Sequence, residues 1–209
     1  MVVHINKYIM DNNLINKIKQ VLTDPINFFE SLRKETGIKS AFVYLLILSL
    51  FSTFLGFIVG QLFQNNYYDL LSKMFGFEFP KPQFAAGMLI LFTAMGYCIG
   101  LIYSFIMAGI LHVWILIFGG KENYSKTYQL YVYSRTPQFI IGWIPFIGYL
   151  TWIYDLVLLI IGTQKVHNIS KVKAVLMYAI PIVLIGLFSL GIMIFSISLL
   201  KSNPNIFQN

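Results

Sequence analysis

The feature that most constrains this chain is its division into long apolar runs. Residues 40–63 and 172–200 each have the length of one bilayer crossing, which takes about 20 apolar residues. Two further runs are longer, 84–118 and 136–164. Only 11% of the residues are charged, against about a quarter in a soluble domain. The sequence therefore predicts an all-α integral membrane protein, a multi-pass helix bundle in a lipid bilayer.

The basic residues indicate how often the two longer runs cross the bilayer. Cytoplasmic loops carry the excess of Lys and Arg. The bias is strongest, 12 inside against 3 outside, if run 84–118 crosses once and run 136–164 enters and returns. Pro145 and Gly148 stand near the middle of the second run, where a turn needs them. We predict five spans, near residues 40–63, 84–118, 136–148, 149–164 and 172–200.

This arrangement fixes the expected topology. Residues 1–39 form a cytoplasmic N-terminal region, residues 40–201 the membrane domain, and residues 202–209 a tail on the outside. The third and fourth spans are shorter than a full crossing requires. They are either short tilted helices or a re-entrant hairpin shielded by the other helices, because lipid does not tolerate exposed loop backbone.

Two amphipathic helices are predicted before the first span. The first places its apolar side chains on one face. Thr23 or Asp24 can then cap the second, which Pro25 begins. Phe28 and Phe29 lie on the second helix. We expect them to contact the inner leaflet or a protein partner. Packing of these helices against the cytoplasmic loops is the alternative.

A polar, tyrosine-rich segment, residues 119–137, follows the second span. Asn123 or Ser125 can cap a helix, and Pro137 should end that helix near Ser134. Three tyrosines repeat there at helical spacing: Tyr124, Tyr128 and Tyr131. Because tyrosine favours the membrane interface, these rings are expected to contact the bilayer surface or a partner at the cytoplasmic face.

Small residues predict how the first two spans pack. Gly56 and Gly60 form a GxxxG pattern in the first span, and Gly96 and Gly100 form another in the second. Such residues let helix backbones approach closely in lipid. We expect packing of these two helices on each other, with homo-oligomer formation through one motif as the alternative.

One acidic residue, Asp155, lies deep in an apolar run, where an ionisable group is a functional hypothesis by default. His112 and Arg135 are expected nearer the inner surface. A contact between Asp155 and His112 would make a proton-sensitive pair for a small transporter, whereas hydrogen bonds to tyrosine, serine or backbone would make Asp155 structural. The spans contain no catalytic trio and no metal-ligand spacing, so we predict no enzyme activity and no cofactor. The net charge of +7 is explained by topology, and no nucleic acid partner is predicted.

Three stretches resemble the Yip family of Ypt/Rab-interacting membrane proteins: "DPINFF", "FGGKENYSKTYQLYVYSRTPQFI" and "IPFIGYLTWIYDLVLLIIGTQKVHNISKVKA". The resemblance implies a five-span fold with a cytoplasmic N-terminal region. Eukaryotic members are associated with vesicle trafficking, Golgi and endoplasmic reticulum membranes and prenylated Rab-type GTPases. This chain has no close match to the acidic and tyrosine-glycine motif before their first span, which argues against GTPase binding. Its isoleucine, lysine and asparagine bias favours a prokaryotic cell membrane.

These observations predict a non-enzymatic membrane scaffold that organises the membrane or recruits protein partners at its cytoplasmic face. The alternative is a small transporter or proton-linked carrier that uses Asp155.

Overall fold

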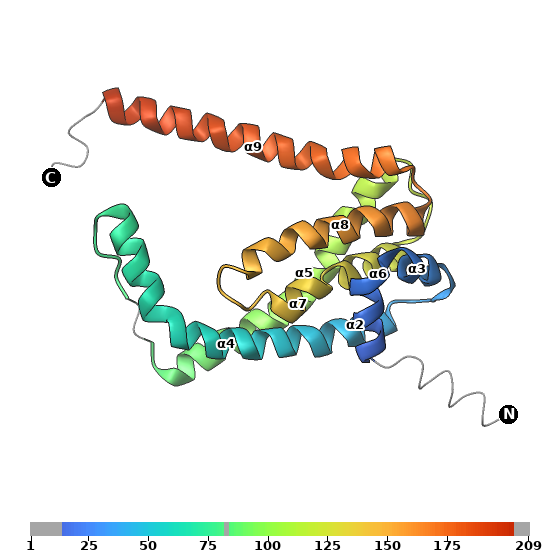
Figure 1. The fold of residues 1–209 in the computed structure, drawn as a ribbon, viewed down its shortest axis with the longest axis horizontal. Helices are drawn as coiled ribbons and strands as arrows, with labels where there is room; N and C mark the ends of the chain where they lie inside the picture. Colours follow the sequence, from blue (N-terminus) through green and yellow to red (C-terminus); the bar gives the residue numbers. More distant parts are fainter. Residues whose placement is uncertain (1–13, 82–83, 203–209) are drawn as a thin grey trace.

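The computed structural model describes residues 14–81 and 84–202, and every regular element in these ranges is a helix (Figure 1). The helices are α2 (Leu14–Thr23), α3 (Pro25–Ser31), the 3₁₀ turn η1 (Leu32–Lys34), α4 (Lys39–Phe75), α5 (Ala86–Ile117), α6 (Tyr124–Ser134), α7 (Thr136–Ile141), α8 (Gly148–His167) and α9 (Lys171–Ser202). The all-α prediction is confirmed for the described part of the chain.

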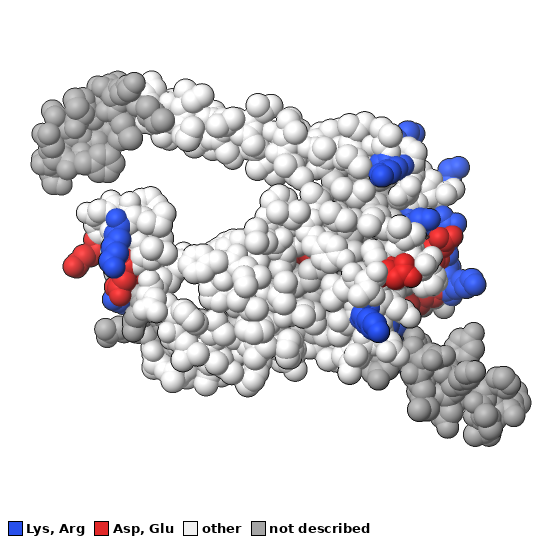
Figure 2. All heavy atoms as spheres, in the orientation of Figure 1, with Lys and Arg blue, Asp and Glu red and all other residues white. Residues whose placement is uncertain are grey.

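Three helices have the length and composition to cross a membrane. They are Lys39–Phe63 of α4, all of α5, and Lys171–Ser196 of α9. The run 84–118 forms one continuous helix. Charged side chains collect at two opposite ends of the molecule, with an almost uncharged band between them (Figure 2). This distribution suits a protein with two polar ends and an apolar middle.

The two short predicted spans form a helical hairpin of α7 and α8. The six-residue α7 rises only about 9 Å, and residues 142–147 then turn the chain into α8. Gly142 is required at this turn because a Cβ there would lie 2.2 Å from the carbonyl oxygen of Gln138. Neither α7 nor α8 is among the helices long and apolar enough to span. The structure thus confirms three long apolar helices and does not confirm the count of five.

Helix α6 lies at the centre of the fold. Its residues 126–134 are all buried, and it packs against α5, α8 and α4. The predicted cap and end of this helix are confirmed: Asn123 accepts a hydrogen bond from the Lys126 backbone N–H at 3.2 Å, and the helix stops at Ser134. The exposure expected for its tyrosine rings is not found, because neighbouring helices cover α6.

The GxxxG patterns do not join the first two spans. A Cβ at Gly56 would lie 3.7 Å from the Cβ of Trp143 in the α7–α8 turn, whereas Cβ atoms at Gly60, Gly96 and Gly100 would meet no described atom within 4 Å. Helix α4 contacts α5 through other groups, including a 3.0 Å hydrogen bond from the Tyr97 hydroxyl to the Leu46 carbonyl. The packing prediction through paired glycines is therefore not supported.

Candidate functional site

One face of α6 binds the segment that leads from the N-terminal helices into α4. The Lys126 ammonium donates hydrogen bonds to the carbonyl oxygens of Leu32 and Glu35. Three residues later, the Gln129 amide donates to the carbonyls of Gly37 at 2.6 Å and Glu35 at 3.3 Å. The Leu32 carbonyl also accepts the Glu35 backbone N–H at 3.1 Å, and α6 supplies side-chain donors to the carbonyls of Leu32, Glu35 and Gly37. We call α3, residues 32–37, α6 and the facing ends of α2 and α8 the polar head.

Tyr133, one turn further along the same face, completes this contact. Its hydroxyl donates to the Glu35 carboxylate at 3.2 Å. The Lys17 ammonium of α2 donates to the Ser40 hydroxyl at 2.7 Å and to the Tyr133 hydroxyl at 3.3 Å, and it lies 3.7 Å from the Glu35 carboxylate. Burial raises the pKa of Tyr133, and the Glu35 charge raises it further. The phenol is thus neutral and acts as a donor to Glu35.

The predicted contact residues of α3 lie inside the polar head. Phe29 is fully buried, and Phe28 meets the Tyr133 ring edge to face at 5.1 Å between centroids. The cap prediction for α3 is confirmed, because the Asp24 carboxylate accepts a hydrogen bond from the Asn27 backbone N–H and Pro25 begins the helix. The expected exposure of Phe28 and Phe29 is not found. The alternative, packing of the amphipathic helices against the rest of the protein, describes the structure.

The other face of α6 carries a hydrogen-bonded histidine pair. The Thr127 hydroxyl lies 2.8 Å from Nδ1 of His112 on α5 and 3.1 Å from Nε2 of His167 on α8. Nδ1 of His167 is buried, with no hydrogen-bond partner among the described residues. We assign the proton to its Nε2, because an unpaired buried N–H is costly. Burial, with a smaller contribution from the nearby His112, lowers the pKa of His167 to about 4.

The paired glycines before α6 allow this arrangement. Gly119 has φ +94°, in the left-handed region that favours glycine. A Cβ at Gly120 would lie 2.4 Å from the Ile115 side chain and 3.2 Å from Nδ1 of His167. The two glycines thus return the chain from α5 to α6 directly over His167.

Tyr124 and Tyr128 attach α6 to α5. The Tyr124 hydroxyl donates to the Phe105 carbonyl at 2.9 Å, and the Tyr128 ring stacks on the Phe105 ring at 4.7 Å between centroids. The Tyr128 hydroxyl also lies 3.3 Å from the Ser104 hydroxyl. Burial raises the pKa of both tyrosines, which keeps them neutral. Their regular spacing therefore serves helix packing within the chain.

Asp155 lies elsewhere, beside the junction of α6 and α7. The groups that interact with its carboxylate are the Arg135 guanidinium and the backbone of Gln138. The guanidinium also lies 4.9 Å from the centroid of the Tyr131 ring. The expected contact of Asp155 with His112 is not found, because His112 faces the first turn of α6 and bonds to Thr127.

Sequence reasoning missed the residues that build the polar head. Lys126, Gln129 and Tyr133 repeat at three- and four-residue spacing on α6, which was a usable signal for one helical face. Thr127 and His167 gave no such signal, because 40 residues separate them.

Comparison with known proteins adds one finding. The family model of the Yip1 domain matches residues 19–193, which covers most of the polar head, all of α4 and α5, and most of α9. No curated protein and no solved structure matches the chain.

Proposed function

The chain belongs to the Yip1 domain family, and on that premise we propose that it is a non-enzymatic membrane scaffold that recruits partners through its polar head. The observation that carries this proposal is the bonding of residues 32–37 by Lys126 and Gln129 of α6. These hydrogen bonds attach the N-terminal helices to the membrane domain, so the two parts form one packed unit. Partners would therefore meet a preformed surface and not a loose N-terminal segment.

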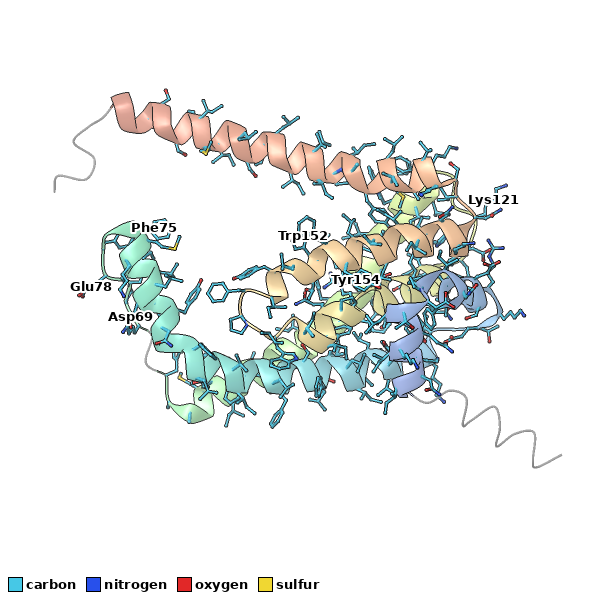
Figure 3. All side chains as sticks on the ribbon, in the orientation of Figure 1. Asp69, Phe75, Glu78, Lys121, Trp152 and Tyr154 are labelled. Carbon is cyan, nitrogen blue, oxygen red and sulfur yellow. The ribbon has the colours of Figure 1, made fainter. Side chains whose placement is uncertain are left out.

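The outer surface of the head is polar and mainly basic. Arg33 donates to the Lys165 carbonyl at 2.7 Å, and Lys165 pairs with Glu30 at 3.3 Å. Lys121 extends from the same end of the molecule (Figure 3), and Ile26 adds an exposed apolar side chain. Such a surface attracts anionic lipid and acidic partner segments. In this proposal Phe28, Phe29 and the α6 tyrosines position the head and do not touch the partner.

We propose a cytoplasmic polar head, with the C-terminus on the opposite side of a prokaryotic cell membrane. The excess of basic residues at the head supports this orientation. The hairpin of α7 and α8 enters and returns on the same side, so its depth does not change the placement of the termini. Figure 1 supports a re-entrant hairpin, because its turn ends short of the far ends of α4 and α9.

The transporter reading has no observation in its favour. The charged group that acts on the Asp155 carboxylate is the Arg135 guanidinium, and His112 bonds to Thr127 instead. In the described ranges, no group of three His, Cys, Asp or Glu residues could hold a metal ion.

The test compares the two polar ends of the protein in its own membrane. A photocrosslinking residue replaces Lys121 at the head or, as the matched control, Lys81 at the opposite end. We expect discrete protein adducts from position 121 and none of the same mass from position 81. Equal adducts from both positions, or none from position 121, would contradict recruitment through the head.

Topology is tested separately in a Cys98→Ala background. A cysteine in place of Lys81 should react with a membrane-impermeant maleimide added to intact cells, and a cysteine in place of Lys121 should react only after lysis. Labelling of position 121 in intact cells would overturn the proposed orientation.

A further inference from the structure

A large groove lies at the opposite end of the molecule from the polar head. It has a volume of about 1290 Å³ and runs between the outer half of α4, beyond Gly56, and the α7–α8 turn. Figure 2 shows the molecule hollowed beside this end of α4. Aromatic side chains line both walls, including Tyr67 from α4, Trp143 and Phe146 from the turn, and Trp152 from α8. The volume exceeds the roughly 300–1,000 Å³ of pockets for ordinary small molecules.

The length of the groove matches one leaflet of a bilayer. Gly56 and Lys73 both line it, and the stretch of α4 between them measures about 25 Å at 1.5 Å per residue. Half of a bilayer with its headgroup region measures about 20–23 Å. An occupant that fills the groove from end to end therefore has the length of a lipid.

The two ends of the groove differ in polarity. At the deep end, the Gln138 side chain accepts a hydrogen bond from the Thr151 hydroxyl, so it is already engaged. At the outer end, the Asp69 carboxylate pairs with Lys81 at 2.7 Å. No described carboxylate lies within 4 Å of the Lys73 ammonium, which is thus left as an available cation. Figure 3 places Asp69 at this outer end of α4 and Trp152 on the facing helix.

We propose that the groove binds one phospholipid, with its acyl chains against Trp143 and α4 and its phosphate beside Lys73. Apolar walls suit the chains, and amphipathic Trp and Tyr rings favour the level of the headgroup. A single cation at the outer end complements a phosphate. The surrounding bilayer supplies the ligand. This site is separate from the polar head and does not depend on the proposed recruitment of partners.

Two glycines provide a matched pair of variants for the test. Gly60 lines the groove, and a Cβ there would meet no described atom within 4 Å, so the ring of Gly60→Phe is placed to occupy the groove. Gly96→Phe on α5 enters equally open space outside the groove. The full chain is purified in detergent, and native mass spectrometry counts the phospholipid molecules retained per chain.

We expect one phospholipid on the wild type and on Gly96→Phe, and at least a tenfold lower retained fraction on Gly60→Phe. Equal retention by Gly60→Phe and wild type would overturn the site. Equal loss from both variants, or only detergent on the wild type, would overturn it as well.

The phosphate contact is tested by lipid replacement. Delipidated protein is titrated in detergent with phosphatidylglycerol and, as a probe that lacks phosphate, with diacylglycerol. Lys73→Gln should weaken phosphatidylglycerol binding about tenfold, because it removes the charged partner of the phosphate, and should leave diacylglycerol binding unchanged. Lys121→Gln is the charge-matched control and should bind as the wild type does. Unchanged phosphatidylglycerol binding by Lys73→Gln would overturn the assignment of the phosphate.

Discussion

The polar head and the outer half of α9 are built differently. At the head, side chains of α6 form hydrogen bonds to backbone carbonyls of residues 32–37 and to partners on α2, α5 and α8. The outer half of α9 presents exposed apolar side chains from Ile182 to Phe195. The head is specified by hydrogen bonds, because each buried polar group must find a partner. The outer half of α9 needs no protein partner. The surrounding lipid is as apolar as its side chains, so no hydrophobic force drives this helix against others. Substitutions in the polar head should therefore lower the unfolding free energy far more than substitutions in the outer half of α9.

The largest effect is expected from Lys126→Met, which removes the buried ammonium that donates to the carbonyls of Leu32 and Glu35. Two hydrogen bonds to a charged group contribute about 1.5–3 kcal/mol each, so we expect a loss of about 3 kcal/mol in unfolding free energy. Thermal unfolding in detergent measures the loss, and faster tryptic cleavage at Arg33 should accompany it. Lys121→Met, at an exposed site five residues earlier, is the control. Equal melting temperatures for the two variants would contradict the described role of Lys126.

The second-largest loss of unfolding free energy is expected on acidification. The pKa of His167 is about 4 in the folded protein against 6.5 for a free histidine, so the unfolded chain binds a proton that the folded chain does not. The stabilisation that results from this difference in pKa is fully present above pH 6.5 and is lost as the pH falls toward 4. From pH 7 to pH 5 the loss is about 2 kcal/mol.

The matching variant is His167→Gln, which keeps an N–H group near Thr127 and cannot titrate. Its melting temperature should depend less on pH than that of the wild type between pH 5 and pH 7. The same pH slope in both proteins would show that His167 is not the responsible group.

A pair of glycine substitutions compares the two regions directly. A Cβ at Gly162 would lie 2.2 Å from the Leu130 side chain and 3.0 Å from the Phe29 ring, whereas a Cβ at Gly186 in the outer half of α9 would meet nothing within 4 Å. Gly162→Ala should cost about 1–2 kcal/mol through overpacking. Gly186→Ala should be neutral or stabilise by up to about 1 kcal/mol through helix propensity. Reversed signs in thermal unfolding would contradict the contrast between head and outer half.

The smallest effect is expected from Tyr133→Phe, which removes only the hydroxyl that donates to Glu35 and accepts from Lys17. We expect a loss of about 1 kcal/mol, with the ring packing against Phe28 retained. Tyr149→Phe removes a hydroxyl from a ring that is 73% exposed and should not change the melting temperature. A loss of the same size in both variants would contradict a stabilising role for the hydrogen bonds of the Tyr133 hydroxyl.

Local signals in the sequence were sufficient for the elements and their ends. Asp24 and Pro25 predicted the start of α3, Asn123 predicted the cap of α6, and Pro145 and Gly148 predicted the turn between α7 and α8. Each depends on residues within one or two turns of the chain. The Yip family was also recognised from three short stretches, and the family match confirms it.

Contacts between helices could not be predicted in the same way. The tyrosines of α6 have the composition of an interfacial belt, and only the positions of α5 and α8 around them bury their rings. The glycine patterns of α4 and α5 are equally ambiguous, because the sequence does not say whether a small residue faces a helix or lipid. Asp155 has Arg135 as its charged neighbour because the chain reverses between α7 and α8.

By itself the sequence determined an all-helical membrane protein with long apolar helices, capped short helices and polar ends of unequal charge. These properties follow from hydropathy and from local backbone preferences, which neighbouring residues fix. Only the tertiary structure decided that residues 119–137 hold the buried centre of the polar head and that Lys126 bonds to carbonyls 91 and 94 residues away. The reason is physical: a polar side chain near the membrane can be satisfied by water, by lipid headgroups or by a distant carbonyl, and packing selects among them.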